Sequence, residues 1–371
     1  NGRSRGLGDV YKRQQLSLRP NQLHYEKIMI KPLSLIAVIL CGLGIALYFY
    51  EQGAEQGTEK LSGQILLKQL DTKNLNKIQV RSSEGLLELH QSQQGWQETG
   101  LDYPLSGEKI QEFLLELTDL RLGDLVTDNP ERHALFQLLS PPESKEQWED
   151  EKHAVAVNLL RGDDSSLLEI LLGKNREQGS GQYLRYADSD EVYLLPDTLD
   201  IDTDPNDWLN KELTSLDEKM IQKLDFQNSS DSDFTLSYDN QSNSWSMSDS
   251  PEAELKEDEI NDILKRLQEL SFTKILTGEL SDNSTGRTQL TNLEATLADG
   301  KIYALQIGEN ENPEGNHVMS LRMSIQIEAD SPDSRKEMER FNQKVGGRLF
   351  EIRSWEAKDL LKKKADLLKE D

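Results

Sequence analysis

The sequence predicts an α+β protein with one N-terminal transmembrane helix followed by two tandem domains, each an antiparallel sheet with a helix. Three observations lead to this fold class. Residues 32–50 form an apolar run without a charge. Short segments of alternating apolar residues, separated by polar turns, fill much of the remaining chain. An amphipathic helix pattern preceded by a tryptophan occurs twice, the second time 150 positions after the first.

The run at residues 32–50 is long enough for a helix of roughly 28 Å, close to the hydrocarbon thickness of a bilayer. Lys27 and Lys31 precede it, whereas Glu51 and Glu55 follow it. Positive charge stays on the cytoplasmic side of a membrane. The N-terminus is therefore predicted to be cytoplasmic and the body, from about residue 51 onward, to lie outside.

Two alternatives to an uncleaved anchor remain open: a cleaved signal peptide with a poor site at Gly44-x-Ala46, and a buried core helix. Residues 1–28 are predicted to be a non-native or cytoplasmic N-terminal extension, because residues 1–14 resemble translated sequencing-adapter sequence and Met29 offers a start. Residues 51–62, rich in Gly, Glu and Gln, are predicted to be a spacer.

Composition limits the classes of partner. The net charge of −25 argues against nucleic acid, whose binding requires clustered cations, and against lying flat on anionic lipid. Cys41, the single cysteine, lies inside the apolar run, so the body has neither a disulfide nor a thiol nucleophile. This usage favours a bacterial periplasm over a eukaryotic secretory compartment.

The body is predicted to contain an internal duplication, whose two copies are here called the first repeat (63–199) and the second repeat (208–371). Each opens with two strand patterns, at 78–80 and 87–89 in the first and at 224–226 and 234–236 in the second, followed by Trp96 or Trp245. A helix follows, with Ser106 as its N-cap in the first repeat. The two apolar stripes consist of Ile110, Phe113, Leu114, Leu117 and Leu120, and of Ile260, Ile263, Leu264, Leu267 and Leu270.

Alternating strand patterns resume after each helix. They cover 155–159, 168–172, 183–186 and 192–195 in the first repeat, and 293–297, 303–307, 318–327 and 349–352 in the second. Asp299-Gly300 is a typical hairpin turn. Residues 200–207 are a predicted linker between the repeats, and 281–288 and 309–317 are predicted polar loops. The stretch 355–368 is predicted to be helical, with packing residues Trp355, Leu360, Leu361 and Leu368 and with the basic run Lys362-Lys363-Lys364 as ordinary helix chemistry near a C-terminus.

Candidate chemical groups are scattered along the body. The histidines His90, His133, His153 and His317 have no zinc-site spacing, and they are predicted to be surface residues. Asp200-x-Asp202-x-Asp204 resembles a calcium loop, but Pro205 and Lys211 stand where Gly and Glu are required, so a solvated linker is predicted. The acid pairs Asp163/Asp164 and Asp231/Asp233 are attributed to the high acidic content. The tryptophans Trp96, Trp208, Trp245 and Trp355 are predicted to be core anchors, with sugar-stacking platforms as the alternative.

An ordered series of short motifs resembles the bacterial domain-of-unknown-function 4340 family. The series runs Gly95-Trp96, Tyr103-Pro104-Leu105, Leu171-Leu172-Gly173-Lys174, Gln182-Tyr183-Leu184-Arg185, Val192-Tyr193-Leu194-Leu195 and Asp207-Trp208-Leu209. The likeness is clearest over residues 65–225; the second repeat lacks the Tyr-x-Arg. It implies an envelope protein with a single membrane anchor, often encoded beside components of gliding-motility-type ABC transporters. It supplies no catalytic residue, cofactor or metal site.

The leading functional hypothesis is therefore a non-enzymatic accessory or scaffold protein of the bacterial inner membrane, with a periplasmic body and an ABC-transporter permease or related envelope subunit as partner. A second hypothesis is a periplasmic module that binds peptide or glycan at the seam, the contact between the two repeats. A hydrolase is the third, and it requires a clustered pair of carboxylates or a His–carboxylate pair in a cleft.

Overall fold

The fold is described from a computed structural model, which defines residues 74–329 and 331–369. The predicted extension (1–28), anchor (32–50) and spacer (51–62) lie outside these residues. Across the described ranges, no helix combines the length and the apolar character needed to cross a membrane. The described residues belong to the compact unit Gln64–Asp371.

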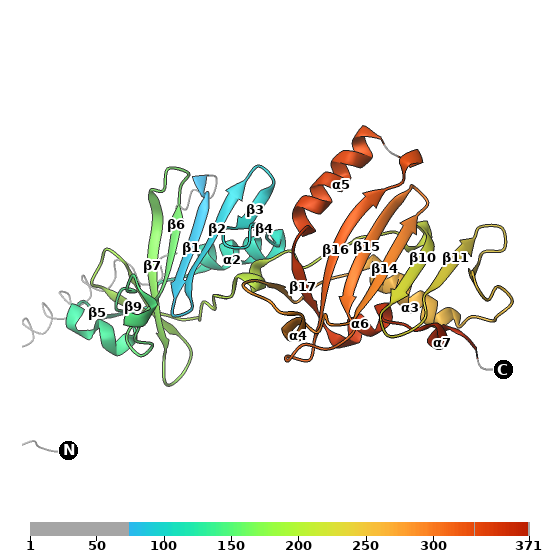
Figure 1. The fold of residues 1–371 in the computed structure, drawn as a ribbon. Helices are drawn as coiled ribbons and strands as arrows, with labels where there is room; N and C mark the ends of the chain where they lie inside the picture. The colour runs from blue at the N-terminus through green and yellow to red at the C-terminus, as the bar shows by residue number, and fades with distance from the viewer. Residues whose placement is uncertain (1–73, 330, 370–371) are drawn as a thin grey trace, which may run out of the picture. The chain divides into compact units, whose positions relative to one another are not determined.

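The first repeat forms a nine-stranded antiparallel sheet in the order β4-β3-β2-β1-β6-β7-β8-β9-β5 (Figure 1). Its strands are β1 (Lys77–Ser82), β2 (Gly85–Ser92), β3 (Gly95–Glu98), β4 (Tyr103–Pro104), β5 (Leu125–Thr127), β6 (Val155–Leu160), β7 (Ser166–Asn175), β8 (Gln182–Tyr186) and β9 (Val192–Leu195). Its helices are α2 (Gly107–Asp119) and the short 3₁₀ helices η2 (Pro130–Phe136) and η3 (Lys145–Gln147).

The second repeat forms an eight-stranded antiparallel sheet in the order β12-β11-β10-β14-β15-β16-β17-β13. Its strands are β10 (Ile221–Asn228), β11 (Phe234–Asp239), β12 (Ser244–Met247), β13 (Lys274–Leu276), β14 (Leu290–Leu297), β15 (Lys301–Gly308), β16 (His317–Ile325) and β17 (Leu349–Ile352). The helices over this part are η4 (Pro205–Trp208), η5 (Glu218–Met220), α3 (Glu257–Gln268), α4 (Asp282–Thr285), η6 (Ile327–Ala329), α5 (Pro332–Val345), α6 (Ser354–Leu360) and α7 (Lys364–Leu367).

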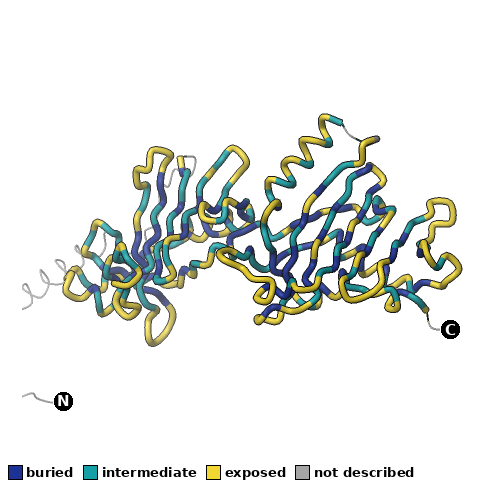
Figure 2. The backbone as a smooth tube through the Cα atoms, in the orientation of Figure 1, coloured by how far each residue is buried: buried dark blue, intermediate teal, exposed yellow. Residues whose placement is uncertain are grey.

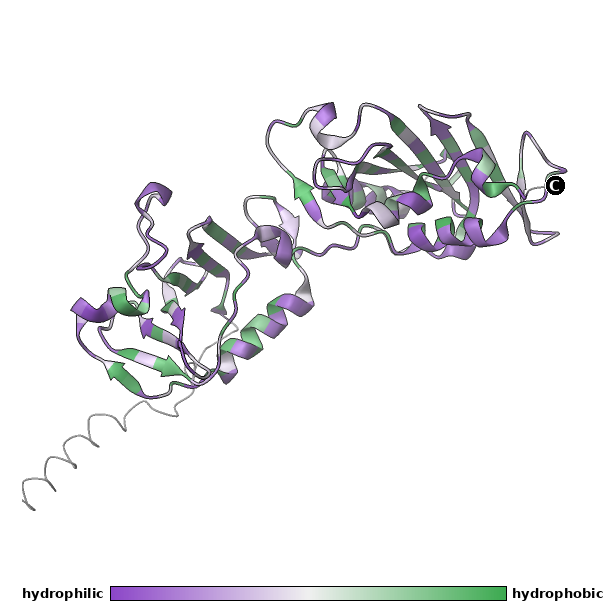
Figure 3. Ribbon diagram, turned by 90° about the horizontal axis from the view of Figure 1, so that it is seen from below, coloured by the Kyte–Doolittle hydropathy of each residue, from purple (hydrophilic) through white to green (hydrophobic). Residues whose placement is uncertain are grey.

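The two sheets follow the same path once β4 is set aside. In both, three strands form a meander, a helix follows, the next strand goes to the far edge, and four further strands complete the sheet. Figure 3 shows hydrophobic residues alternating with polar ones along these strands, and Figure 2 shows the matching alternation of buried and exposed positions. The α+β class with two antiparallel sheets is confirmed.

The predicted helices form and bury their apolar stripes. In α2, Ile110, Phe113 and Leu117 are buried, whereas Leu114 and Leu120 are half-buried. Ser106 is the N-cap, as predicted, because its hydroxyl oxygen accepts a hydrogen bond from the Lys109 amide (3.3 Å).

In α3, the four buried residues are the predicted Ile260, Ile263, Leu264 and Leu267. Burying such a side chain contributes roughly 1.5–3 kcal/mol. These stripes therefore hold the helices against their sheets.

The predicted C-terminal helix at 355–368 is divided into α6 and α7. The Leu367 carbonyl accepts a hydrogen bond from the Lys256 amide (2.8 Å), and Leu368 pairs with Leu255 as an antiparallel bridge. Lys363, at φ −95° and ψ 161°, is extended and interrupts the helix before α7, and the pairing of Leu368 follows where α7 ends. Lys362 and Lys364 form ion pairs with Glu259 and Asp249 instead of serving a helix C-terminus. The helices α4 and α5 were not predicted.

Candidate functional site

The four histidines of the described region lie on different elements, and each bonds to a different group. Two are buried, His133 and His317, which corrects the expectation of surface positions. The bonds join His90 to Thr99 (3.0 Å), His133 to the Asp190 carbonyl (3.0 Å), His153 to the Glu149 amide (2.8 Å) and His317 to the Gly308 carbonyl (2.7 Å). Among the described residues, no group of three or more His, Cys, Asp or Glu is placed to hold a metal ion.

The calcium-like stretch leads into η4 without forming a helix or strand of its own before Pro205. Asp202 forms an ion pair with Lys109, and its carbonyl accepts a hydrogen bond from Trp208 Nε1 (2.9 Å). Asp204 caps η4 by accepting from the Asn206 amide (2.8 Å). These contacts fix the chain between the repeats.

The acid pairs occupy turns. Asp164 forms an ion pair with Lys77 (2.8 Å), and Asp163 accepts hydrogen bonds from Ser165 (2.6 and 3.0 Å). These turn bonds lower the pKa of Asp163, which is fully exposed. Asp233 accepts from the Asn228 amide (3.1 Å). Asp231 accepts from the Ser232 amide (2.8 Å). Asp163, Asp231 and Asp233 thus bond within their own turns, whereas Asp164 reaches Lys77 on β1.

Among the described residues three carboxylates are buried: Glu98 on β3, Glu351 on β17 and Glu356 on the neighbouring α6. Glu98 accepts from the Gly100 and Leu101 amides (2.9 and 2.5 Å). Glu351 accepts from the side chains of Asn312, Asn316 and Thr273, and Glu356 forms ion pairs with Arg266 and Arg353. In the described part of the chain, these contacts give each carboxylate a structural role.

The tryptophans differ in their environments. Trp208 is buried in the core, 2% exposed, and meets Phe113 edge-to-face at 5.2 Å. Trp355 is 56% exposed with Arg266 stacked 4.6 Å from its ring, so the prediction that it packs in the core is wrong. Trp96 and Trp245, at matching positions of β3 and β12, are both half-buried.

The motifs that carry the family resemblance have structural roles. Arg185, 6% exposed, donates hydrogen bonds to four backbone carbonyls and to the Ser140 hydroxyl. The Gln182 side chain donates a hydrogen bond to the Gly173 carbonyl and accepts one from the Leu199 amide. At Gly173 a Cβ would stand 2.2 Å from the Phe136 carbonyl oxygen, so only glycine fits without movement. The motifs therefore hold the outer strands of the first sheet to the η2 segment.

The seam is filled with side chains around Tyr103, which is 0% exposed. Its ring contacts Phe272 (5.5 Å) and Phe350 (6.3 Å) edge-on, and the guanidinium of Arg348 lies 5.5 Å from the ring centroid. Arg348 also donates hydrogen bonds to the Leu101 and Asp102 carbonyls (2.6 and 2.9 Å). Burial raises the pKa of Tyr103. At this point the two repeats are packed against each other, and Arg348 of the second repeat bonds to backbone carbonyls of the first.

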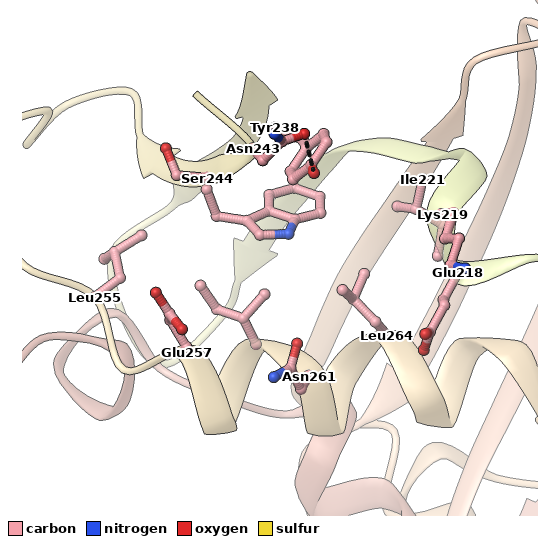
Figure 4. A pocket seen from close by; sticks show the side chains of 12 residues that line it. Glu218, Lys219, Ile221, Tyr238, Asn243, Ser244, Leu255, Glu257, Asn261 and Leu264 are labelled. Atoms are coloured by element: carbon pink, nitrogen blue, oxygen red, sulfur yellow. Dashed lines mark hydrogen bonds between the residues drawn. The ribbon is translucent and has the colours of Figure 1, made fainter. Parts of the chain in front are cut away.

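A cavity of about 360 Å³ lies within the second repeat, between the β11–β12 hairpin and α3. Figure 4 shows Glu257, Asn261 and Leu264 on the helix, with Tyr238 and Asn243 of the hairpin on the opposite side. The apolar part of the lining comprises Ile221, Leu255, Ile260 and Leu264, together with the Trp245 and Tyr238 rings, which lie 5.4 Å apart.

The polar part of the lining includes Glu218, Lys219, Glu257 and Asn261. Neither Glu218 nor Glu257 forms an ion pair with a described residue, and the Asn261 amide donates to none of them. Tyr238 donates a long hydrogen bond to Asn243 (3.4 Å). Lys219, Glu257 and Asn261 are exposed and Glu218 is half-buried, so these groups are open to solvent as well as to the cavity. A concave surface that combines apolar side chains with a few polar groups is the usual composition of a ligand pocket.

The family model for a domain of unknown function (DUF4340) matches residues 96–295, from β3 to β14. The chain belongs to the DUF4340 family. Comparison with curated proteins and with solved structures gives no match.

Sequence reasoning named Trp245, Ile260 and Leu264 only as packing residues, with sugar stacking as the alternative for Trp245. It did not single out Glu218, Asn243, Glu257 or Asn261. A difference between the two repeats in the sequence could have indicated the cavity. At the positions matching Tyr103-Pro104-Leu105, the second repeat has Ala253-Glu254-Leu255, which lacks the large aromatic residue. That difference marks the place where the two repeats diverge.

Proposed function

We propose that the chain is a non-enzymatic, membrane-anchored accessory or scaffold protein of the bacterial envelope, associated with an ABC-type transporter. The observation that carries the proposal is the contrast between candidate groups. In the described region the histidines and buried carboxylates are held in separate structural contacts, whereas the Trp245 cavity has polar groups without partners. This arrangement suits binding better than catalysis.

The proposed location is the inner membrane, with residues 32–50 as the anchor, the N-terminus cytoplasmic and the body periplasmic. Its support is the charge asymmetry around the apolar run and the strongly acidic composition. Protease added to intact spheroplasts should digest the body. Survival of the body until the cells are lysed would refute this topology.

The proposed partner is an ABC-transporter permease or a related envelope subunit. The test is affinity capture of the full chain from detergent-solubilised membranes, with an unrelated single-pass acidic protein as control. Transporter subunits should be enriched only with this chain. Repeated recovery of none would refute the association.

A second candidate function is a periplasmic module that binds peptide or glycan. The sequence placed this site at the seam, where the Tyr103 cluster is closely packed. The Trp245 cavity gives this candidate a specific location within the second repeat instead. Saturable binding of a defined ligand that depends on cavity residues would favour it over a purely scaffolding role.

A further inference from the structure

The outer edges of the two sheets differ beside the matched tryptophans. In the first repeat, β4 covers β3 through the pairs Gln97↔Pro104 and Glu98↔Tyr103. The Trp96 carbonyl accepts a hydrogen bond from the Leu105 amide (2.9 Å). The edge of β3 is therefore closed by the chain itself.

In the first repeat, residues 104–106 pair both with β3 and with residues 208–210. In the second repeat, the matching residues 254–256 make only the second of these two pairings. Residues 254–256 pair with the C-terminal segment: Lys256 donates to the Leu367 carbonyl (2.8 Å) and Lys369 to the Glu254 carbonyl (2.9 Å). The first repeat has the same pair of bonds, from Ser106 to Trp208 and from Asn210 to Pro104 (2.8 and 2.9 Å). However, no described residue donates to the Trp245 carbonyl from that side, and β12 ends the sheet. At the end of β12 the Met247 carbonyl accepts a hydrogen bond from the Ser250 amide (3.1 Å), so the open part of this edge is at Trp245.

The register indicates that the backbone of Trp245 faces this open side. Trp245 pairs with Tyr238 on β11 as Trp96 pairs with Gln91 on β2. Ser248 donates to the Thr235 carbonyl (3.0 Å) as Thr99 donates to the Glu88 carbonyl (2.9 Å). Because alternate residues of an antiparallel strand direct their N–H and C=O groups to opposite sides, Trp245 presents both groups outward, as Trp96 does.

The cavity lies beside this open edge. Trp245 and Leu255, whose counterparts are joined in the first repeat, are both part of its lining. Its carboxylates, Glu218 and Glu257, outnumber its single cation, Lys219, and the whole chain carries −25. The charge thus favours a basic ligand, and the apolar lining favours one with a hydrocarbon stem.

We propose that the edge of β12 at Trp245 binds an extended basic segment of a partner polypeptide as an added antiparallel strand, at the position that Leu105 takes beside Trp96 in the first sheet. The peptide donates an N–H to the Trp245 carbonyl and accepts from the Trp245 amide. Because alternate side chains of a strand point to the same face, one Lys or Arg side chain enters the cavity. This inference rests on the binding role proposed above and names the class of ligand.

Backbone pairing distinguishes a peptide from a glycan. An unpaired strand edge offers N–H and C=O groups at the spacing of another strand, and native proteins normally cover or block such edges. A sugar can stack on an aromatic ring, but it does not reproduce this pattern. The glycan is therefore an outcome of the test and not part of the proposal.

The experiment uses the full chain in detergent and a fluorescein-labelled synthetic hexapeptide of alternating Val and Thr with one central Arg, followed by fluorescence anisotropy. Saturable binding is expected, weakened at least about tenfold by N-methylation of alternate peptide nitrogens. Replacing the Arg by Glu should weaken binding by a similar factor. Equal binding of the N-methylated peptide would overturn strand addition, and equal binding of the Glu peptide would overturn the charge assignment.

Matched variants of the two repeats locate the site. Trp245→Phe, or Glu218→Gln combined with Glu257→Gln, should weaken peptide binding severalfold, whereas Trp96→Phe and Glu108→Gln should leave it unchanged. If the variants of the first repeat weakened peptide binding as much as those of the second, the β12 edge would be excluded as the binding site. Unchanged urea midpoints show that the variants fold.

Competition separates the remaining outcomes. Displacement of the peptide by a chitin oligosaccharide at similar concentration would assign the cavity to glycan. Transporter capture is scored independently with the wild-type chain. Failed capture with intact peptide binding refutes the transporter association alone, and the reverse result refutes the strand-addition site alone.

Discussion

Arg185 offers the sharpest stability prediction, because one side chain holds several backbone segments together. Its Nε donates to the buried Leu138 carbonyl (2.9 Å), and Nη2 donates to the Ser140 hydroxyl (3.1 Å). Nη1 donates to three carbonyls, of Tyr186 at the end of β8 and of Ala187 and Ser189 in the turn after it, at 3.1–3.2 Å. We predict that Arg185→Met, which keeps the hydrocarbon stem, destabilises the first repeat.

The expected loss in the free energy of unfolding follows from the hydrogen-bond acceptors that Arg185→Met leaves without a donor. A buried carbonyl without a donor costs about 1–3 kcal/mol. The other acceptors are partly buried and can meet water, so each lost bond contributes about 0.5–1 kcal/mol. The total over the five lost bonds is about 3–7 kcal/mol, a substantial part of the stability of a typical domain. Arg161→Met is the control, because exposed Arg161 bonds only to Ser165 and Ser166 and should lose less than about 0.5 kcal/mol.

Urea unfolding of the full chain, followed by tryptophan fluorescence, measures the global effect. Hydrogen exchange with mass spectrometry measures the local one, and peptides spanning residues 136–153 should exchange faster in Arg185→Met. A shift no larger than that of Arg161→Met, with unchanged exchange in this segment, would refute the structural role given to the motif.

Three further predictions concern stability, each measured by urea midpoints. Ser106→Ala removes the cap bond to the Lys109 amide and should cost about 1 kcal/mol; no change would remove Ser106 as a cap. Gly173→Ala brings a methyl group against the Phe136 carbonyl and should cost about 1–3 kcal/mol; a neutral effect would show that the segment yields freely. Burial raises the pKa of Tyr303 to about 12, so between about pH 10 and 12 the folded chain keeps a proton that the unfolded chain has lost, and stability falls as pH rises. Tyr303→Phe should therefore lose less stability than the wild type between neutral pH and about pH 11, and equal losses would contradict this sign.

The sequence predicted the local elements well because their signals are local. The stripe of α3 is a property of neighbouring turns of one helix, and Ser106 caps a helix three residues away. The prediction of a single C-terminal helix was wrong because Lys363 is extended between α6 and α7 and because Leu368, after α7, pairs with Leu255, far away in the chain. Helical periodicity carries no information on such a partner. The candidate site was mostly missed for the same reason: its lining joins η5, the β11–β12 hairpin and α3.

The alternation of apolar residues determined that this chain forms strands, and the recurrence of the pattern predicted two similar sheets, because side-chain periodicity follows directly from backbone geometry. The sequence also located the helix in each repeat whose apolar stripe is buried. Only the tertiary structure decided that Tyr103 fills the seam, that β4 closes one sheet edge and that the matching edge at β12 stays open at Trp245. Those outcomes depend on competition between distant segments for the same backbone hydrogen bonds, which no local pattern records.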